Sequence, residues 1–361
     1  MARESVRLRL SLAGEPASDR AGSGFVVGRA ASAPGRTNCD NVGVVADFVI
    51  EVTNLTKTYR TPFARRKVQA LRGVTFNVER GQIFGFVGPN GAGKTTTIRT
   101  LMGLIRPTSG QARLLGQPVP SRAARSRVGF LPESPYFYDY LTVPELLDLA
   151  GRLFGVASAE RCKRADRLIE RVGLGNARNQ SLKKFSKGML QRAGLAQALM
   201  SEPELVVLDE PMSGLDPIGR KEVRDLIVEL RDQGTTVFFS THILSDVEAI
   251  TDRVAIVARG QLQAYGTPAD LVAKTIRGVE IAARLATADA PGELVAEATG
   301  VRRVGDLLSL VLPSGADVDQ WIARAHAAGA KIVSVTPRHE TLEDLFLREV
   351  ASADAALGAP A

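Results

Sequence analysis

An eight-residue segment, Gly88-Pro-Asn-Gly-Ala-Gly-Lys94-Thr95, matches the pattern G-x-x-x-x-G-K-[ST] of a phosphate-binding loop. Glycines at this spacing let successive backbone N–H groups converge on one phosphate. The helix that we expect to begin near Lys94 adds the positive end of its dipole. Lys94 would reach the β- and γ-phosphate oxygens, and the Thr95 hydroxyl would coordinate Mg²⁺. The segment therefore predicts a site for a nucleoside triphosphate.

Two acidic residues, Asp209 and Glu210, end the apolar run Leu205–Leu208. Taken alone, this pattern also fits a buried strand whose Asp209 caps the following turn. Next to a phosphate-binding loop, the two carboxylates have a chemical role: Asp209 would hold Mg²⁺ through water, and Glu210 would polarise the attacking water. Ligands of parallel sheets bind at the carboxyl ends of strands, which is where this pair lies.

The elements around these residues alternate between strand and helix patterns. A short apolar run at 83–87 precedes the loop, and a helical pattern that stops before Pro107 follows it. Further along the chain we expect strands at 204–210, 235–241 and 253–260, and helices at 219–234 and 243–252. Such alternation predicts an α/β fold with a mostly parallel sheet and helices on both faces.

At this point the chain resembles the ABC family of ATPases. Phe185-Ser186-Lys187-Gly188-Met189 is similar to the family's signature LSGGQ, although Lys187 and Met189 depart from it. From the residues alone, this segment is a helix start with Ser186 as N-cap. Ser213-Gly-Leu-Asp216 resembles the D-loop, and His242 matches the switch histidine that contacts the γ-phosphate. The resemblance covers about residues 49–268.

The resemblance implies a P-loop NTPase cassette with an antiparallel β subdomain and a helical subdomain, using ATP and Mg²⁺. Catalysis is assigned to Glu210, His242 and Lys94. The metal contacts would be Thr95, Asp209 and Glu133, the last of which stands where most members carry Gln. The nucleotide-binding residues, some contributed to a second subunit, would be Tyr59, Gly88, Pro89, Asn90, Gly91, Ala92, Gly93, Lys94, Thr95, Thr96, Ser186, Lys187, Gly188 and Asp216. Tyr59 would stack on adenine, although an ordinary structural tyrosine is a competing interpretation.

Changes in composition and in hydrophobic periodicity along the sequence predict the domain boundaries. Residues 1–47 are rich in Gly, Ala, Ser and Arg without periodicity and indicate a flexible extension. The ATPase domain is expected at 48–268, with its helical subdomain at about 133–200. A small α+β accessory domain follows at 278–350, and a loose tail at 351–361.

Composition narrows the possible partners and the location. The net charge of +7 is compatible with nucleic acid, anionic lipid or nucleotide but selects none of them, and we expect no nucleic-acid partner. No run of about 18 apolar residues is present, so we expect no membrane span in this chain. The resemblance implies a separate membrane permease and a location at the cytoplasmic face of the membrane. The family also implies a homodimer or heterodimer of ATPase subunits. Cys39 and Cys162 fit no metal-site spacing.

Several kinds of ABC protein remain possible. The ending ETLEDLFL resembles the C-terminal domain of ABC-2 type exporter ATPases, which favours export of a substrate. The alternatives are the ATPase of an importer and a soluble regulatory ATPase with weak turnover. Retention of both Lys94 and Glu210 argues against the regulator, because nucleotide binding alone needs no acid that polarises water.

Four aromatic residues crowd into the segment SPYFYDY, namely Tyr136, Phe137, Tyr138 and Tyr140. In the family, the corresponding segment forms the groove that receives a coupling helix of the membrane subunit. Packing in the core of the helical subdomain is an equally good interpretation of the same residues.

We predict that deletion of residues 1–47 leaves the thermal unfolding transition and ATP hydrolysis essentially unchanged, because the segment has no periodic apolar positions that could join a core. Calorimetry and a phosphate-release assay on the truncated protein test this. Aggregation or loss of the transition would show that the segment contains a structured element.

Overall fold

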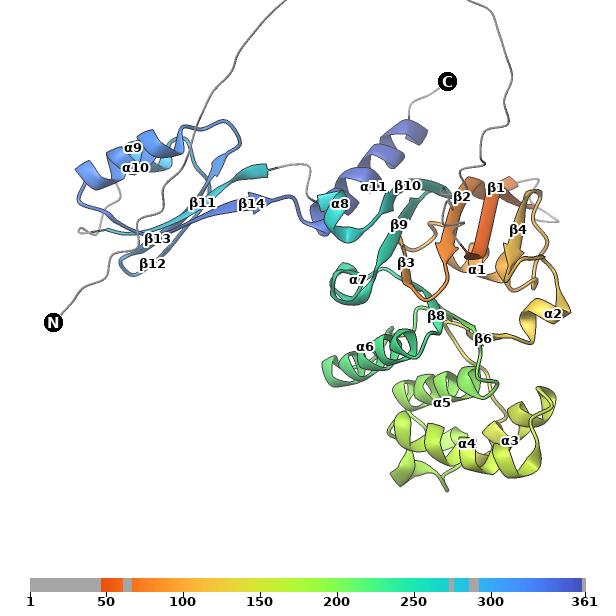
Figure 1. Cartoon of the computed structure of the whole chain (residues 1–361). Helices are drawn as coiled ribbons and strands as arrows, with labels where there is room; N and C mark the ends of the chain where they lie inside the picture. Colours follow the sequence, from red (N-terminus) through yellow and green to blue (C-terminus); the bar gives the residue numbers. More distant parts are fainter. Residues whose placement is uncertain (1–46, 61–66, 273–275, 286–291, 359–361) are drawn as a thin grey trace, which may run out of the picture. The chain divides into compact units, whose positions relative to one another are not determined.

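The computed structural model describes residues 47–60, 67–272, 276–285 and 292–358 (Figure 1). The extension expected at 1–47 therefore lies outside the described residues, except for Asp47. The carboxylate of Asp47 forms an ion pair with Arg80 over 2.6 Å.

A six-stranded sheet forms the centre of the ATPase domain. Its strands are β3 (Ile83–Val87), β6 (Val128–Leu131), β7 (Leu205–Asp209), β8 (Thr236–Thr241), β9 (Arg253–Ala258) and β10 (Gln261–Gly266). They lie in the order β10-β9-β3-β8-β7-β6, and only β10 pairs antiparallel with its neighbour. Because β3, β8 and β7 are adjacent and parallel, the residues that follow their carboxyl ends meet at one edge of the sheet. The predicted α/β class is confirmed.

Both faces of this sheet are buried, as the side chains of β8 show. Phe238 packs into one apolar cluster with Phe84 and Phe86, whereas its neighbours Val237 and Phe239 pack into a second cluster on the opposite face. Successive residues of a strand point to opposite faces, so continuous apolar runs are required wherever layers cover both sides.

An antiparallel sheet covers the Phe84 face. It contains β1 (Phe48–Arg60), β2 (Lys67–Glu79), β4 (Ser109–Leu114) and β5 (Gln117–Pro118), in the order β2-β1-β4-β5. Helix α1 (Lys94–Leu101) contributes Ile98 and Leu101 to the same cluster, and the short helix α2 (Arg122–Arg125) follows β5. Residues 67–69 at the start of β2 pair with the end of β1.

The opposite face of the sheet carries the other helices of the ATPase domain. A helical group contains α3 (Val143–Leu153), α4 (Ser158–Arg171), the 3₁₀ turns Gly175–Ala177 and Leu182–Lys184, and α5 (Lys187–Leu199). The remaining helices of the ATPase domain are α6 (Pro217–Asp232), α7 (Leu244–Ile250) and α8 (Pro268–Val272). Thr142 and Glu145 form a capping box that fixes the start of α3.

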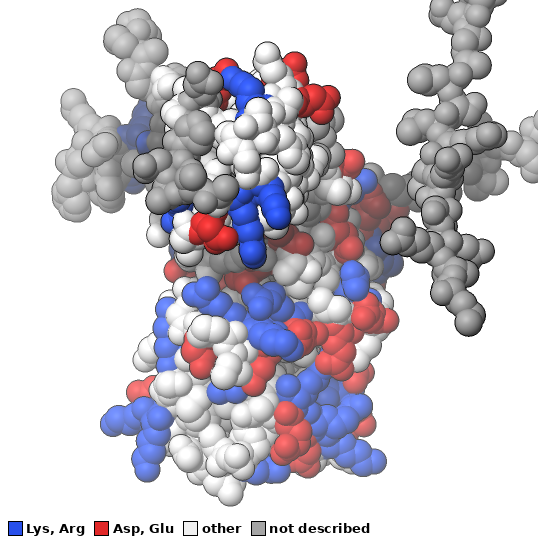
Figure 2. Space-filling view, turned by 90° about the vertical axis from the view of Figure 1, so that its left-hand side faces the viewer, with Lys and Arg blue, Asp and Glu red and all other residues white. Residues whose placement is uncertain are grey.

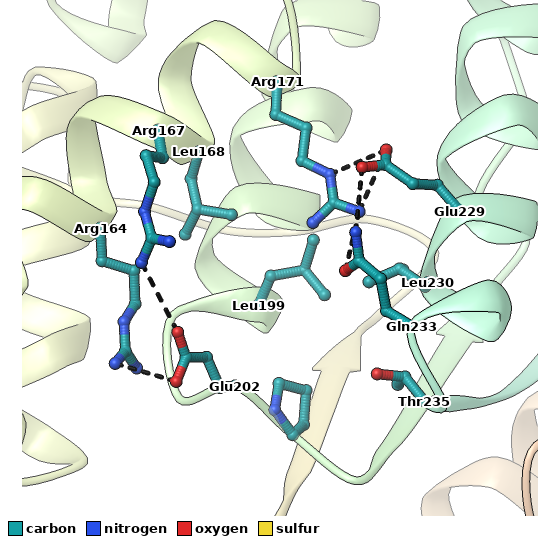
Figure 3. A pocket seen from close by; sticks show the side chains of 11 residues that line it. Arg164, Arg167, Leu168, Arg171, Leu199, Glu202, Glu229, Leu230, Gln233 and Thr235 are labelled. Atoms are coloured by element: carbon teal, nitrogen blue, oxygen red, sulfur yellow. Dashed lines mark hydrogen bonds and ion pairs between the residues drawn. The ribbon is translucent and has the colours of Figure 1, made fainter.

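Ion pairs join the helical group to the sheet core across a pocket of about 420 Å³ between α4 and α6 (Figure 3). Arg171 of α4 donates through Nε to Glu229 of α6 over 3.1 Å. Arg164 and Arg167 pair with Glu202 over 3.1 and 3.6 Å. On the face shown in Figure 2, the lower half interleaves basic and acidic side chains rather than separating them by sign.

The chain from β11 onward forms an α+β unit with the element order βαββαβ. Its elements are β11 (Ile276–Arg284), α9 (Gly292–Val295), β12 (Thr299–Val304), β13 (Leu307–Pro313), α10 (Val318–Ala327) and β14 (Lys331–His339). The antiparallel order β12-β13-β11-β14 is that of a ferredoxin-like sheet. The indole N–H of the buried Trp321 donates to the Leu294 carbonyl over 2.9 Å and ties α10 to α9.

The last helix, α11 (Leu342–Gly358), changes two expected boundaries. Residues 351–358, predicted as part of a loose tail, continue this helix because the segment is rich in the strong helix former Ala; residues 359–361 lie outside the described residues. The helix also does not belong to the core of the α+β unit. Leu342 and Leu345 instead join the main apolar cluster of the ATPase domain, so the accessory unit is inserted between α8 and α11.

Candidate functional site

The loop Gly88–Thr95 connects β3 to α1 at the carboxyl edge of the central sheet. A side chain at Gly88 would begin 2.3 Å from the Val257 carbonyl oxygen, so no larger residue fits there. Gly91 and Gly93 have φ values of 81° and 107°, which L side chains rarely adopt. Gly93 is the N-cap of α1, so the first backbone N–H groups of this eight-residue helix remain available to an anion.

Lys94 is buried beneath this loop. Its Nζ donates to the carbonyls of Gly88 and Pro89 over 2.6 and 3.3 Å, and it lies 3.2 Å from Glu210 Oε1. Lys94 and Glu210 are 5% and 6% exposed, which makes this a buried ion pair. The two residues lie 116 positions apart in the sequence, and the adjacency of β3, β8 and β7 brings them together.

Asp209 lies at the end of β7 and is almost fully buried. Its Oδ1 accepts a hydrogen bond from Ser240 Oγ over 2.6 Å, and the Thr95 hydroxyl bonds the same carboxylate. Burial raises the pKa of Asp209 above its ordinary value, which the bonds from Ser240 and Thr95 only partly oppose. The negative charges of Glu133 and Glu210 raise this pKa further.

Glu210 has an unusual backbone, with φ at 51° in the left-handed region. A non-glycine residue there is strained, and such strain persists only where surrounding contacts hold it. Its N–H donates to Ser240 Oγ over 3.0 Å, and its Oε2 lies 2.9 Å from His242 Nδ1. The two carboxylate oxygens of Glu210 are thus divided between Lys94 and His242.

Two further residues, neither of them predicted from the sequence, support Asp209 and Glu210. Ser240 is completely buried in β8, and its single hydroxyl serves Asp209 and Glu210 together. Gln191 of α5 is also buried, and its Nε2 lies 3.5 Å from the Glu210 carbonyl. The available signal was a polar residue within an otherwise apolar segment, since Ser240 follows VFF in a strand and Gln191 sits in GMLQRAGLA.

The signature residues line a different pocket, of about 570 Å³, at the start of α5. Ser186 is the N-cap of α5, and its Oγ accepts from the Met189 N–H over 3.2 Å. Lys187, Gly188 and Asp216 line the same pocket, and Asp216 caps α6 by accepting from the Gly219 N–H over 2.9 Å. None of the residues that line this pocket comes from the loop Gly88–Thr95.

The remaining candidates lie in different surroundings. Tyr59, near the end of β1, is 40% exposed, and Lys57 Nζ lies 5.1 Å from the centre of its ring. The ring is therefore accessible for stacking. Glu133 follows β6 and is exposed, yet its charge acts on Asp209.

The oxygen ligands at Thr95 and Asp209 fit Mg²⁺, a hard cation that usually takes one or two carboxylates together with substrate phosphates. Within the described part of the chain, no group of three or more His, Cys, Asp and Glu side chains is arranged to hold a metal ion. A hydroxyl and a carboxylate beside a phosphate-binding loop match a cation that arrives with its nucleotide.

Residues 71–213 match the family model described as ABC transporter. An ABC transporter ATP-binding protein of Synechocystis is 42% identical over 84% of this chain and 84% of its own length. A daunorubicin resistance ATP-binding protein of Streptomyces coeruleorubidus is 36% identical over 84% of this chain and 96% of its own. A solved ATP-binding subunit of an ABC transporter superposes with a TM-score of 0.56 at 33% identity, covering 62% of this chain and 91% of that chain.

We predict that Asp209→Asn increases thermal stability. The folded state raises the pKa of Asp209, so ionisation of this carboxylate costs folding free energy, and that cost develops as pH rises through the range between the unfolded and folded pKa values. Asn removes the charge and keeps the oxygen that accepts from Ser240.

The gain should be present at neutral pH and vanish in strong acid, where Asp209 is protonated in both states. Calorimetry across pH measures it, with Asp225→Asn on the exposed face of α6 as control. A variant less stable than the wild type at neutral pH would contradict the prediction.

Proposed function

Because the chain belongs to the family of ABC transporter ATP-binding proteins, we propose that it binds and hydrolyses ATP to power export of a substrate through a separate membrane permease. The network that joins Lys94, Glu210 and His242 beside a phosphate-binding loop carries this proposal. Export is supported by relatives named for daunorubicin resistance and, in Bacillus licheniformis, for bacitracin transport, the latter 42% identical over 59% of this chain and 68% of its own length.

In this proposal, the loop Gly88–Thr95 binds the ATP phosphates and Tyr59 stacks on adenine. Thr95 and Asp209 would hold Mg²⁺, which supplies positive charge to the phosphates when bound, and Glu133 lies where it adds to the negative field of that site. Asp209 must be ionised for this role, and its raised pKa leaves it closer to protonation than an ordinary aspartate.

The ion pair between Lys94 and Glu210 suggests how nucleotide binding prepares hydrolysis. A γ-phosphate that draws Lys94 away releases Glu210 Oε1, because a single ammonium cannot remain equally close to both. That oxygen can then accept a proton from the attacking water. In this proposal, His242 retains its contact with Oε2 and donates to the γ-phosphate from its other ring nitrogen.

We propose that the signature pocket completes the site of a second ATPase subunit. The loop Gly88–Thr95 can enclose ATP from one side only, and Ser186, Lys187 and Gly188 line a different pocket. In a two-fold dimer, each nucleotide would touch the loop of one subunit and the start of α5 in the other. Closure and opening of this dimer would drive the conformational change of the permease.

Glu210→Gln is expected to trap a dimer in Mg-ATP, because Gln keeps the size of the side chain but cannot accept the proton from water. Light scattering at micromolar protein should show monomers without nucleotide and dimers with it. A monomer under both conditions would count against the composite site.

Two double variants, each adding one substitution to the Glu210→Gln protein, distinguish loss of ATP binding from loss of the contact between subunits. Lys94→Ala should lose the dimer together with tight ATP binding, at a cost of about 2–3 kcal/mol in nucleotide affinity. Ser186→Arg should lose the dimer while each monomer still binds ATP, because a bulky cation fills the pocket at the start of α5.

The aromatic segment after β6 contains one residue that packs in the core and three tyrosines that are exposed. Phe137 is partly buried and packs against the main apolar cluster. Tyr136, Tyr138 and Tyr140 are 93%, 59% and 74% exposed, and the rings of the last two stack with centroids 5.7 Å apart. We propose that these tyrosines contact a cytoplasmic element of the permease, because clustered exposed aromatic residues are typical of interfaces.

No helix among the described residues is long and apolar enough to cross a membrane. In our proposal, the chain reaches the cytoplasmic face of the membrane through the permease that these tyrosines contact.

Substitution of Tyr136 and Tyr138 by Ala should uncouple transport and leave the basal ATPase rate of the isolated subunit within about two-fold, because exposed side chains away from structural features contribute little to stability. Phe137→Ala is the matched control and should lower thermal stability, since it removes packing from the core. Full transport by the Tyr136/Tyr138 variant would place the permease contact elsewhere.

A further inference from the structure

Helix α11 contacts α7, α8, β9 and β10. The Leu342 N–H at the start of α11 donates to Glu248 Oε1 of α7 over 3.2 Å. Leu342 is fully buried and Leu345 is 5% exposed, and both join the apolar cluster that contains Val247 of α7. The carboxylate of Glu248 also lies at the positive end of the α11 dipole, where negative charge is favourable.

Strand β3 and helix α6 restrict the movement of α7 on the sides that do not face α11. A side chain at Gly85 of β3 would begin 3.2 Å from Val247 Cγ1, so α7 lies directly on the strand that leads into the phosphate-binding loop. Arg224 of α6 pairs with the buried Asp246 over 2.5 Å. Helix α7 is therefore held between β3, α6 and α11.

His242 lies two residues before α7 and is 45% exposed. The side chain of His242 forms a hydrogen bond with Glu210. His242 lies between β8, which ends at Thr241, and α7, which begins at Leu244, so its position relative to Glu210 depends on both elements. The contacts of α7 with β3, α6 and α11 fix the α7 side.

We propose that α11 is a positioning element for His242 in ATP hydrolysis, with Leu345 and Glu248 as the residues through which it acts. The inference rests on the proposed role of His242 and extends it, because it assigns a catalytic effect to a helix that lies beyond the ATPase domain in the sequence. Loss of α11 docking frees α7 on one side and loosens His242, while neither Leu345 nor Glu248 belongs to the phosphate-binding loop.

The junction between the accessory unit and α11 is short and internally bonded. Only Glu340 and Thr341 separate β14 from α11. Thr341 donates through N–H and hydroxyl to Asp344 over 3.1 and 2.9 Å, and the buried Glu340 pairs with Arg348 over 2.5 Å. These bonds tie the two linking residues to α11 itself.

The test is a double-mutant cycle on the full chain. Leu345→Ala and, separately, the milder surface substitution Glu248→Ala are combined with wild-type His242 and with His242→Ala. Leu347→Ala, which alters a 58% exposed position of the same helix, is the matched control. Single-turnover measurement with labelled ATP keeps the slow His242→Ala rates accessible, and KM for ATP is determined in parallel.

With His242 present, we expect Leu345→Ala to lower kcat about ten-fold and Glu248→Ala to lower it several-fold, because small misplacements of a catalytic group are costly. KM for ATP should stay within about two-fold, because the phosphate-binding loop is unchanged. In the His242→Ala background, both substitutions should change the rate by less than about two-fold, because residues that act through one group are not additive. Leu347→Ala should behave as wild type in both backgrounds.

Equal losses in the two backgrounds, or no loss from Leu345→Ala and Glu248→Ala, would overturn the inference and leave the proposed function standing. If Leu345→Ala fails to fold, the Glu248→Ala cycle decides alone. A full kcat in the His242→Ala single variant would instead refute the proposed role of His242, and this inference with it.

Discussion

The buried ion pair between Lys94 and Glu210 is the interaction on which the arrangement of the site depends. Removing two charges from water is costly, and the loss of one partner would leave the other unpaired in the interior. The pair therefore requires β3 and β7 to be held at a fixed separation, with β8 between them. The continuous apolar strands and the stacked Phe84 and Phe238 supply that rigidity. In the proposed function, a nucleotide phosphate competes with Glu210 for Lys94, so this ion pair would respond to ligand binding.

Strand β8 connects the two acids, Asp209 and Glu210, to His242. Ser240 bonds both Asp209 and the backbone of Glu210, and the chain reaches His242 two residues later. One strand thus orients Asp209, holds the strained backbone of Glu210 and leads directly to His242. The left-handed conformation of Glu210 is maintained by contacts from neighbouring elements, which is the condition under which such strain persists.

Much of this could be predicted from the sequence, because the key residues occur in compact motifs. The order of strands and helices followed from periodicity, and the loop Gly88–Thr95 and the pair Asp209–Glu210 followed from local spacing. Ser240 and Gln191 were missed because their hydrogen-bond partners are distant in the sequence. A single polar residue in an apolar run does not indicate which residue it will contact. The aromatic segment was ambiguous for a similar reason, since only packing separates Phe137 from the tyrosines beside it. The boundary at α11 failed because helix propensity does not reveal which domain a helix joins.

The accessory α+β unit leaves the ATPase domain after α8 and returns to it at α11, and these two helices contact each other. The entry and exit points of the insertion are therefore close together, so the length of the inserted chain has little effect on the closure of the surrounding fold. Modules of different size could occupy this place during evolution without redesign of the catalytic machinery. The same geometry offers a place for engineered sensors, in which a foreign domain between α8 and α11 would report on or control the turnover of its host.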